Sequence, residues 1–160
     1  MKHGESLTFK QAVAQTPALG ELVWQPGLPA LGADSQHVQC LETQRLAGSV
    51  NLDEALKTRY PAEPRWDYAI GWYRGSGEVA IWVEAHPAYT GEVEVVIRKV
   101  QWLRDWLAAS APALDTLTKR DESPFFWLAT GGVSITRNSP QARRLAKSGL
   151  RYPVRVLRLE

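Results

Sequence analysis

The sequence predicts an α/β fold, an α+β sandwich in which a central mixed sheet containing an antiparallel hairpin is flanked by helices. Two segments with alternating apolar residues, Arg65–Tyr73 and Val79–His86, are joined by the turn sequence RGSGE and predict the hairpin. The segment Gly91–Ala109 follows with an apolar stripe at helical spacing, which predicts a helix packed on the sheet. Pro124–Thr130 (PFFWLAT) then predicts a further strand.

The N-terminal part differs in composition from the rest. Residues 1–48 are rich in Gly, Pro, Gln and Ala, and we interpret them as an arm or cap on a core formed by residues 49–160. Within this arm we expect a short helix at Leu7–Gln15 and a strand at His37–Thr43. Gln25–Ser35 is expected to be a loop, because glycine and proline interrupt it.

Capping residues and prolines define the first elements of the core. Ser49 is expected to cap a helix over Leu52–Arg59, which stops before Pro61. Pro87 is expected to end the second strand of the hairpin. Thr90 is a suitable N-cap for the long helix that follows.

The C-terminal part predicts a turn, a helix and a strand. Gly131–Gly132 predicts a turn that leads into Val133–Thr136. Ser139–Pro140 combines an N-cap with a proline at the first helical position, and Gly149 closes the helix. Val154–Leu159 is expected to form the last strand.

The composition limits the classes of function. A length of 160 residues with 44% hydrophobic and 22% charged residues fits one globular domain. Cys40 is the single cysteine, which excludes an intramolecular disulfide or a multi-cysteine metal site and favours a cytoplasmic location. No apolar run approaches the roughly 20 residues that cross a bilayer, and the beginning MKHGESLTFKQ lacks the apolar segment of a secretory signal.

The charge is unevenly distributed along the chain. The net charge is only +2, but no acid interrupts the basic residues between Arg137 and Arg158. Such a stretch suits phosphates or acidic partners, and an ordinary solvated surface is the equal alternative. Arg143, Arg144 and Lys147 on the predicted helix are the candidate nucleic-acid-binding residues.

The hairpin brings two acids together. With an even loop centred on Gly75–Ser76, Asp67 lies opposite Glu84, whereas a three-residue loop would place Asp67 opposite Ala85. Directly opposed like charges destabilise a sheet, so a covered pair needs a cation, a shared proton or a strong donor. Mg²⁺ or Mn²⁺ held by the two carboxylates meets this need. The alternative is a plain ion pair of Asp67 with Arg65 or Lys99, with Glu84 paired to another basic residue.

Lys99 is the candidate lysine. It lies on the apolar flank of the helix predicted over Gly91–Ala109, between Val95 and Trp102 in the helical net. A lysine in this position either extends to the helix edge or meets an acid. The functional hypothesis directs its ammonium to Asp67 and Glu84.

Two further residues are candidates for the same site. His86 follows Glu84 by two residues on the same strand face, where it is a candidate metal ligand, general base or phosphate contact. Glu54, on the preceding helix, is a candidate additional ligand. A structural histidine and a solvated glutamate are the alternatives.

An acid on one strand, Glu-x-basic on the next and a helix behind them resemble the PD-(D/E)XK nuclease-like (restriction-endonuclease-like) superfamily. The resemblance covers about residues 51–159, where Asp67 in RWDYAIGW matches the first acid and Glu84 in WVEAH the second. His86 stands where the family usually has lysine, and Lys99 fits members in which this lysine has moved to the following helix. Glu54 resembles the acid that some branches carry on the leading helix.

The sequence departs from the family pattern at several points. Trp66 replaces the proline before the first acid, and the Glu-x-Lys triplet is Glu-x-His. The usual strand between the leading helix and the first acid is missing, unless His37–Thr43 supplies it and Leu7–Gln15 is the leading helix. These departures indicate a divergent member, which need not be active.

The resemblance implies hydrolysis of phosphodiester bonds in nucleic acid with Mg²⁺ or Mn²⁺ as cofactor. Asp67, Glu84 and Glu54 would hold the metal, while Lys99 or His86 would position the attacking water. The C-terminal basic region would contact the nucleic-acid backbone.

Two non-catalytic functions compete with cleavage. A protein-interaction module on the same scaffold would use tryptophans around Trp102–Trp106 as contact anchors. A module that only binds nucleic acid would use Arg143, Arg144 and Lys147.

Overall fold

The computed structural model describes residues 6–160, so residues 1–5 of the predicted arm lie outside the described part. In chain order its α-helices and strands are α1 (Phe9–Ala14), β1 (Val38–Cys40), β2 (Leu46–Asn51), α2 (Leu52–Leu56), β3 (Tyr68–Tyr73), β4 (Glu78–Ala88), α3 (Val93–Ser110), α4 (Pro112–Thr116), β5 (Phe125–Val133), α5 (Pro140–Ser148) and β6 (Leu157–Leu159). Short 3₁₀ helices connect them: η1 (Glu21–Val23), η2 (Pro29–His37), η3 (Thr43–Arg45), η4 (Thr90–Glu92) and η5 (Arg120–Glu122).

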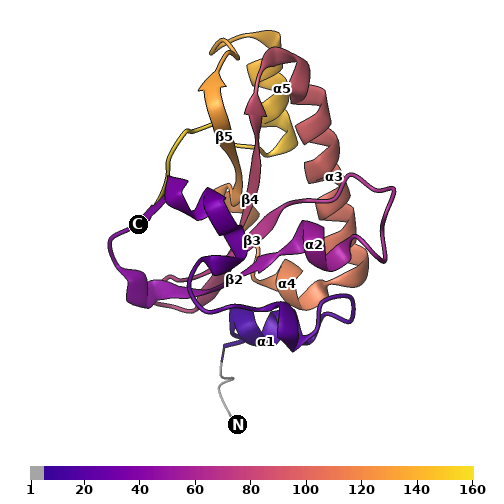
Figure 1. The fold of residues 1–160 in the computed structure, drawn as a ribbon, viewed down its shortest axis with the longest axis vertical. Helices are drawn as coiled ribbons and strands as arrows, with labels where there is room; N and C mark the ends of the chain where they lie inside the picture. The colour runs from indigo at the N-terminus through magenta and orange to yellow at the C-terminus, as the bar shows by residue number, and fades with distance from the viewer. Residues whose placement is uncertain (1–5) are drawn as a thin grey trace.

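The central sheet is mixed. Its strands lie in the order β2-β3-β4-β5, with antiparallel β2–β3 and β3–β4 pairs and a parallel β4–β5 pair. The short strands β1 and β6 form a separate parallel pair. Figure 1 shows α3 and α5 along one side of the sheet, with η2 and the C-terminal end on the other. The predicted α+β architecture, a mixed central sheet flanked by helices, is confirmed.

The hairpin β3–β4 has the even register. Tyr73 pairs with Glu78 and Tyr68 with Val83, which leaves four residues in the loop, Arg74–Gly77. The backbone N–H of Arg74 donates to the carbonyl of Gly77 across this loop at 2.9 Å. Extrapolated by one residue beyond Tyr68 and Val83, this register places Asp67 opposite Glu84, which agrees with the hydrogen bond from the Asp67 N–H to Glu84 Oε1.

Apolar side chains cover both faces of the sheet. On one face, residues of β3 and β4 pack with the apolar stripe of α3; the buried set includes Ala69, Ala80, Trp82, Val96, Val100, Leu103 and Leu107. On the other face they pack with η2 and the β1–β6 pair; this set includes Leu31, Ile70, Trp72, Ile81, Val83 and Leu157. A polar side chain pointing into either layer is therefore removed from water and needs a partner.

The N-terminal segment packs on the same core as the sheet. The side chain of Thr8 caps α1, and Phe9 is fully buried against β3. A Cβ atom at Gly71 would lie 2.5 Å from the Phe9 ring, so a glycine is what allows this close approach. The division into residues 1–48 and 49–160 stays a prediction, although Gly48 lies within β2.

The start of α2 differs from the prediction. Asn51 is the N-cap, and its side chain accepts a hydrogen bond from the Glu54 N–H at 3.0 Å. Ser49 lies inside β2, where its Oγ accepts from the Ala30 N–H at 3.3 Å. The helix ends at Leu56, short of the predicted Arg59.

Two other predictions of loop and cap were wrong. The segment from Pro29 to His37 forms η2 where a loop was expected. The N-cap of α3 is Glu92, while Thr90 begins η4 and donates from its hydroxyl to the Ser134 carbonyl at 3.3 Å.

Both long strands extend beyond their expected ends. β4 continues through Pro87 to Ala88, at a shift in the register between β4 and β5 where the missing proline N–H does not interrupt the ladder. β5 continues through Gly131 and Gly132, so no turn forms there.

The last helix follows its capping signals. The side chain of Ser139 accepts from the Ala142 N–H at 3.1 Å, Pro140 is the first helical residue, and Gly149 ends α5 with a left-handed backbone. The predicted C-terminal strand shortens to Leu157–Leu159.

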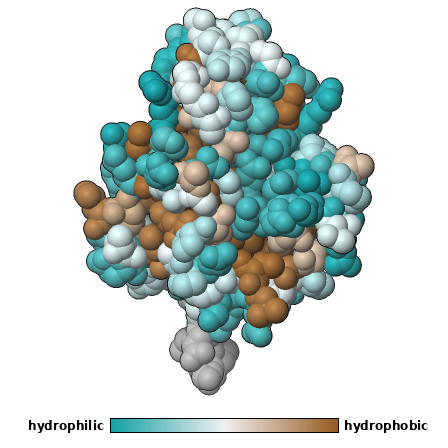
Figure 2. Space-filling view, in the orientation of Figure 1, coloured by the Kyte–Doolittle hydropathy of each residue, from teal (hydrophilic) through white to brown (hydrophobic). Residues whose placement is uncertain are grey.

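The surface carries few large apolar residues. The tryptophan predicted as an anchor, Trp106, is buried and stacks on the half-buried Trp102 with ring centroids 6.0 Å apart, so the expectation of exposed anchors there is wrong. Figure 2 shows hydrophobic residues gathered over the lower half of one face, near α1 and β2, with mostly hydrophilic residues above. Within residues 6–160, no helix has both the length and the apolar character of a membrane span.

Candidate functional site

Asp67, Glu84 and Lys99 meet on the face of the sheet that α3 covers. Asp67 immediately precedes β3, Glu84 lies in β4 and Lys99 lies in α3. The hairpin register opposes the two acids, and the apolar stripe of α3 fixes the helix on the same face. The Lys99 stem therefore crosses the apolar layer, and its ammonium ends at the carboxylates, as predicted.

Each carboxylate oxygen of the pair has a donor. Lys99 Nζ donates to Glu84 Oε2 and lies 3.5 Å from Asp67 Oδ1. The Asp67 backbone N–H donates to Glu84 Oε1 at 3.2 Å, and the Ala85 N–H donates to Asp67 Oδ2 at 3.1 Å. The cation that the opposed acids require is thus an ammonium from the following helix.

Burial controls the electrostatics of this cluster. The Glu84 side chain is 0% exposed, while those of Lys99 and Asp67 are 15% and 20% exposed. Burial, followed by the charge of Asp67, raises the pKa of Glu84 well above its usual value. Burial also raises the pKa of Asp67, although the Lys99 charge opposes it. Burial lowers the pKa of Lys99, but the charges of Glu84 and Asp67 outweigh it, and the pKa lies above its usual value.

His86 lies beside the cluster and pairs outside it. Its Nε2 is 3.0 Å from Glu92 Oε2, whereas its Nδ1 is 3.7 Å from Glu84 Oε2. The Trp127 indole N–H donates to the His86 carbonyl at 2.9 Å and fixes the strand end. The His86 ring therefore lies between the carboxylates of Glu92 and Glu84, closer to that of Glu92.

Glu92 was not among the predicted site residues. It precedes α3 in the short connection η4, which returns the chain to the end of β4. The short connection between β4 and α3 could have indicated Glu92, because it keeps the residues before the helix close to the last residues of the strand.

The structure does not bring Glu54 to the acids. Its side chain lies on the surface of α2 and pairs with Lys57 at 2.9 Å. Arg65, the alternative partner of Asp67, pairs instead with Asp53 at 3.1 Å. Within the described residues, no hydrogen bond or ion pair joins Glu54 or Arg65 to the Asp67–Glu84 pair.

The three basic residues predicted to bind nucleic acid lie on the exposed side of α5. Arg144 pairs with Glu94 of α3, and Arg143 donates to the Asn138 carbonyl at 2.7 Å. Lys147 is exposed. In residues 6–160, no hydrogen bond or ion pair connects these three side chains with the carboxylate cluster.

The site has few protein ligands for a metal ion. Among residues 6–160, no group of three or more His, Cys, Asp or Glu side chains is arranged to hold one. Two carboxylates suit an ion such as Mg²⁺, which keeps several waters and binds substrate phosphates. Asp67 supplies the partly exposed oxygens and Glu84 the buried ones, so the donor set fits an ion of this kind but no closed protein cage.

Comparisons with protein-family models, with curated proteins and with solved structures find no match for this chain. A functional conclusion therefore depends on the geometry of the cluster and on the chemistry of its residues.

Proposed function

We propose that this protein is a metal-dependent nuclease that hydrolyses phosphodiester bonds of nucleic acid at the Asp67–Glu84–Lys99 cluster. The observation that carries the proposal is the meeting of two opposed acids and one lysine from three separate elements. A buried carboxylate pair costs stability, and a protein that needs only a core would place apolar residues there.

The order of elements supports the resemblance to restriction-endonuclease-like proteins. β2 lies between α1 and Asp67, in the place of the strand that sequence reasoning did not find. Asp67 immediately precedes β3 and Glu84 lies in β4, and α3 with Lys99 leads to β5, which is parallel to β4. This chain order agrees with the pattern on which the resemblance rests: a first acid, Glu-x-basic on the next strand, and then a lysine-bearing helix.

Asp67 and Glu84 are the residues that would hold Mg²⁺ or Mn²⁺, which supplies a Lewis acid for the phosphoryl group. Lys99 carries its positive charge at pH 7, because its pKa lies above the usual value, and it stabilises negative charge that develops on a phosphate. His86, held by Glu92, lies at the rim, where it can accept or donate a proton through Nδ1. The Ala85 N–H orients the Asp67 carboxylate.

The test is cleavage of labelled single-stranded and duplex DNA and RNA with Mn²⁺, with Mg²⁺ and with chelator. Asp67→Asn should lower cleavage at least about a hundredfold, the usual cost of losing an essential electrostatic group. Asp53→Asn, an acid nearby that pairs with Arg65, is the matched control and should keep full activity. Cleavage that survives in Asp67→Asn/Glu84→Gln would refute the proposal.

A non-catalytic module on the same scaffold is the second candidate. It is favoured by the closed hydrogen bonding of the cluster, in which Lys99 satisfies both acids without a metal. A thermal-shift measurement separates the two candidates. At a hundred times its dissociation constant, a bound ion stabilises by about 2.7 kcal/mol, which raises the melting temperature of a chain of this length by about 5–11 °C. The nuclease should show this shift with Mn²⁺ and lose it in Asp67→Asn.

A further inference from the structure

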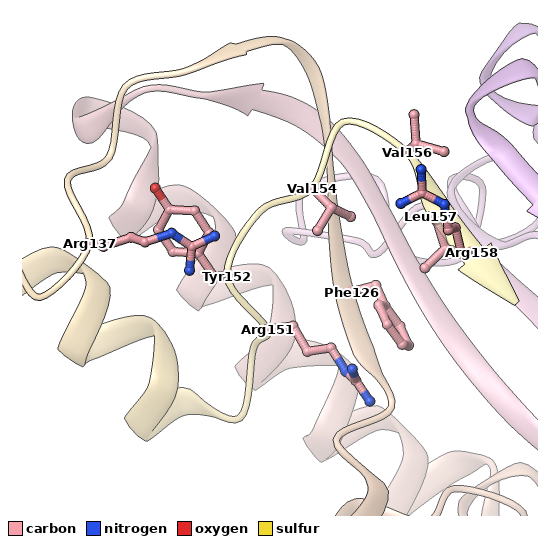
Figure 3. A pocket seen from close by; sticks show the side chains of 8 residues that line it. All are labelled: Phe126, Arg137, Arg151, Tyr152, Val154, Val156, Leu157 and Arg158. Atoms are coloured by element: carbon pink, nitrogen blue, oxygen red, sulfur yellow. The ribbon is translucent and has the colours of Figure 1, made fainter. Parts of the chain in front are cut away.

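A cavity of about 460 Å³ lies between β5 and the C-terminal segment of residues 151–158. We call it the arginine groove, after the residues that give it its chemistry: Phe126, Arg137, Arg151, Tyr152 and Arg158. Figure 3 shows Arg137 beside Tyr152 at one end, Arg151 below Phe126, and Arg158 at the other end. The volume is within the range of pockets that enclose a ligand of nucleotide size.

The groove is positively charged without an opposing acid. Arg137, Arg151 and Arg158 line it, and no carboxylate in residues 6–160 lines it or pairs with any of the three. Arg151 is fixed by donating from Nε to the Ser123 carbonyl at 2.7 Å and from a terminal nitrogen to the Glu122 carbonyl at 2.9 Å. Three guanidinium groups around one hollow create a strongly positive potential that attracts anions.

Two of the guanidinium groups are stacked on aromatic rings. The Arg137 guanidinium lies 4.0 Å from the centroid of the Tyr152 ring, and the Arg151 guanidinium lies 4.4 Å from that of Phe126. The Tyr152 hydroxyl donates to the Ile135 carbonyl, which holds its ring in place. Ordered planar guanidinium groups lose little entropy on binding phosphate, and their free faces also stack on bases.

The groove is separate from the carboxylate cluster. Residues 150–154 run along the free edge of β5, with hydrogen bonds from the Arg151 N–H to the Phe125 carbonyl and from the Val154 N–H to the Trp127 carbonyl. Phe126 points to the opposite side of β5 from Trp127, and Trp127 is the residue paired with Glu84. The Phe126 end of the groove therefore lies on the opposite side of the sheet from the cluster, while the Tyr152 end reaches around the free edge of β5.

A second hollow continues the groove. Its volume is about 640 Å³, and it shares Val156 with the arginine groove. It is lined by Arg155, Thr130 and Gly131 and also by Asp34, whose carboxylate accepts from the Tyr68 hydroxyl. The two hollows together are longer than a single nucleotide needs, and the extension adds one arginine, whose charge Asp34 offsets in part.

We propose that the arginine groove and its extension bind a short single-stranded segment of nucleic acid. The guanidinium groups would contact successive phosphates, and the stacked planes would contact bases that a duplex keeps paired and inaccessible. The proposal goes beyond cleavage, because this binding does not need Asp67, Glu84, Lys99 or a metal. It also replaces the α5 surface as the predicted contact for nucleic acid.

The test measures fluorescence anisotropy of a labelled 12-nucleotide single strand, DNA or RNA, in chelator, so that no cleavage takes place. Arg137→Gln/Arg158→Gln should weaken binding at least tenfold, because both side chains line the groove that would hold the strand. Arg143→Gln/Lys147→Gln removes the same charge from α5 and is the matched control. Its affinity should fall less than about threefold, because it lowers only the overall positive potential of the protein. Circular dichroism checks that each variant is folded.

The salt dependence gives a second readout. Three phosphate contacts on a single strand predict a slope of about −2 for log K against log[salt], and the double variant should reduce it to about −0.7. Equal losses in the α5 control and the groove variant would overturn the proposal, as would duplex binding equal to single-strand binding. A mononucleotide that competes as well as the strand would also overturn it, and would assign the groove to a free nucleotide. Failure of the cleavage assay leaves these results unaffected.

Discussion

Replacing Lys99 with methionine tests the structural core of the candidate site. The substitution keeps the apolar stem and removes the ammonium that Glu84 and Asp67 share. Because the Glu84 side chain is fully buried, its carboxylate is left without a cation in a layer closed by Trp82 and α3. Removing one partner of a buried ion pair costs about 3–5 kcal/mol, which lowers the melting temperature of a chain of this length by about 6–20 °C.

The loss should depend on pH in a stated direction. Burial raises the pKa of both Glu84 and Asp67, so the folded chain binds protons more tightly than the unfolded chain. The stability contributed by these groups is therefore largest at low pH and falls as the pH rises through their folded pKa values. In Lys99→Met a protonated Glu84 needs no ammonium, so the destabilisation should be smaller at pH 5 than at pH 8.

The measurement is equilibrium unfolding in urea, followed by tryptophan fluorescence, for Lys99→Met, Glu84→Gln and the double variant. The double variant should recover most of the loss, because the fully buried charge at position 84 is gone and only Asp67, whose side chain is 20% exposed, lacks its cation. Lys57→Met, which removes a surface partner of Glu54, is the control and should change stability by about 0.5 kcal/mol or less. A loss of less than about 1 kcal/mol at pH 8, or an equal loss at both pH values, would refute the reasoning.

Two smaller predictions concern the neighbourhood of the site. Gly71→Ala should destabilise the protein by about 1–3 kcal/mol, because the new Cβ would lie 2.5 Å from the Phe9 ring. Gly132→Ala is the control, because its Cβ would meet no atom within 4 Å. Thermal unfolding compares the two variants, and an unchanged melting temperature for Gly71→Ala would contradict the packing of α1 on β3. Glu54→Gln should leave any Mn²⁺-dependent thermal shift intact, because Glu54 pairs with Lys57 at the surface; loss of the shift would return Glu54 to the metal ligands.

The hairpin and its acids were predictable because their geometry is local. Alternation fixes which side chains share a face, and an even loop fixes which residues oppose each other, so Asp67 and Glu84 follow from the spacing of the turn. Lys99 follows only in part from the helical net: its neighbours Leu103 and Trp106 are buried as the net predicts, but Val95, assigned to the same apolar flank, is exposed. Few long-range assumptions enter either inference.

β2 was not predictable from the same rules. A shift of register between Leu46 and Ser49 breaks the alternation, and Gly48 adopts a left-handed φ of 108° at that point. The glycine is required because the Trp24 indole lies against it: a Cβ would come within 2.1 Å of the ring nitrogen. Trp24 is distant in sequence from Gly48, so the reason for the irregular strand is tertiary and no local pattern contains it.

The basic C-terminal region shows how a fold separates residues that a sequence groups together. Helix α5 turns Arg143 and Arg144 to the outside, where Arg144 is neutralised by Glu94 from α3. The extended chain after α5 instead runs beside β5 and sets Arg151 and Arg158 around the same hollow as Arg137, which precedes the helix. Charge counting assigns equal weight to all of these residues. The distinction arises from position: Arg144 pairs with Glu94, and Arg143 and Lys147 lie on the open side of α5, whereas Arg137, Arg151 and Arg158 line one hollow and can contact the same ligand.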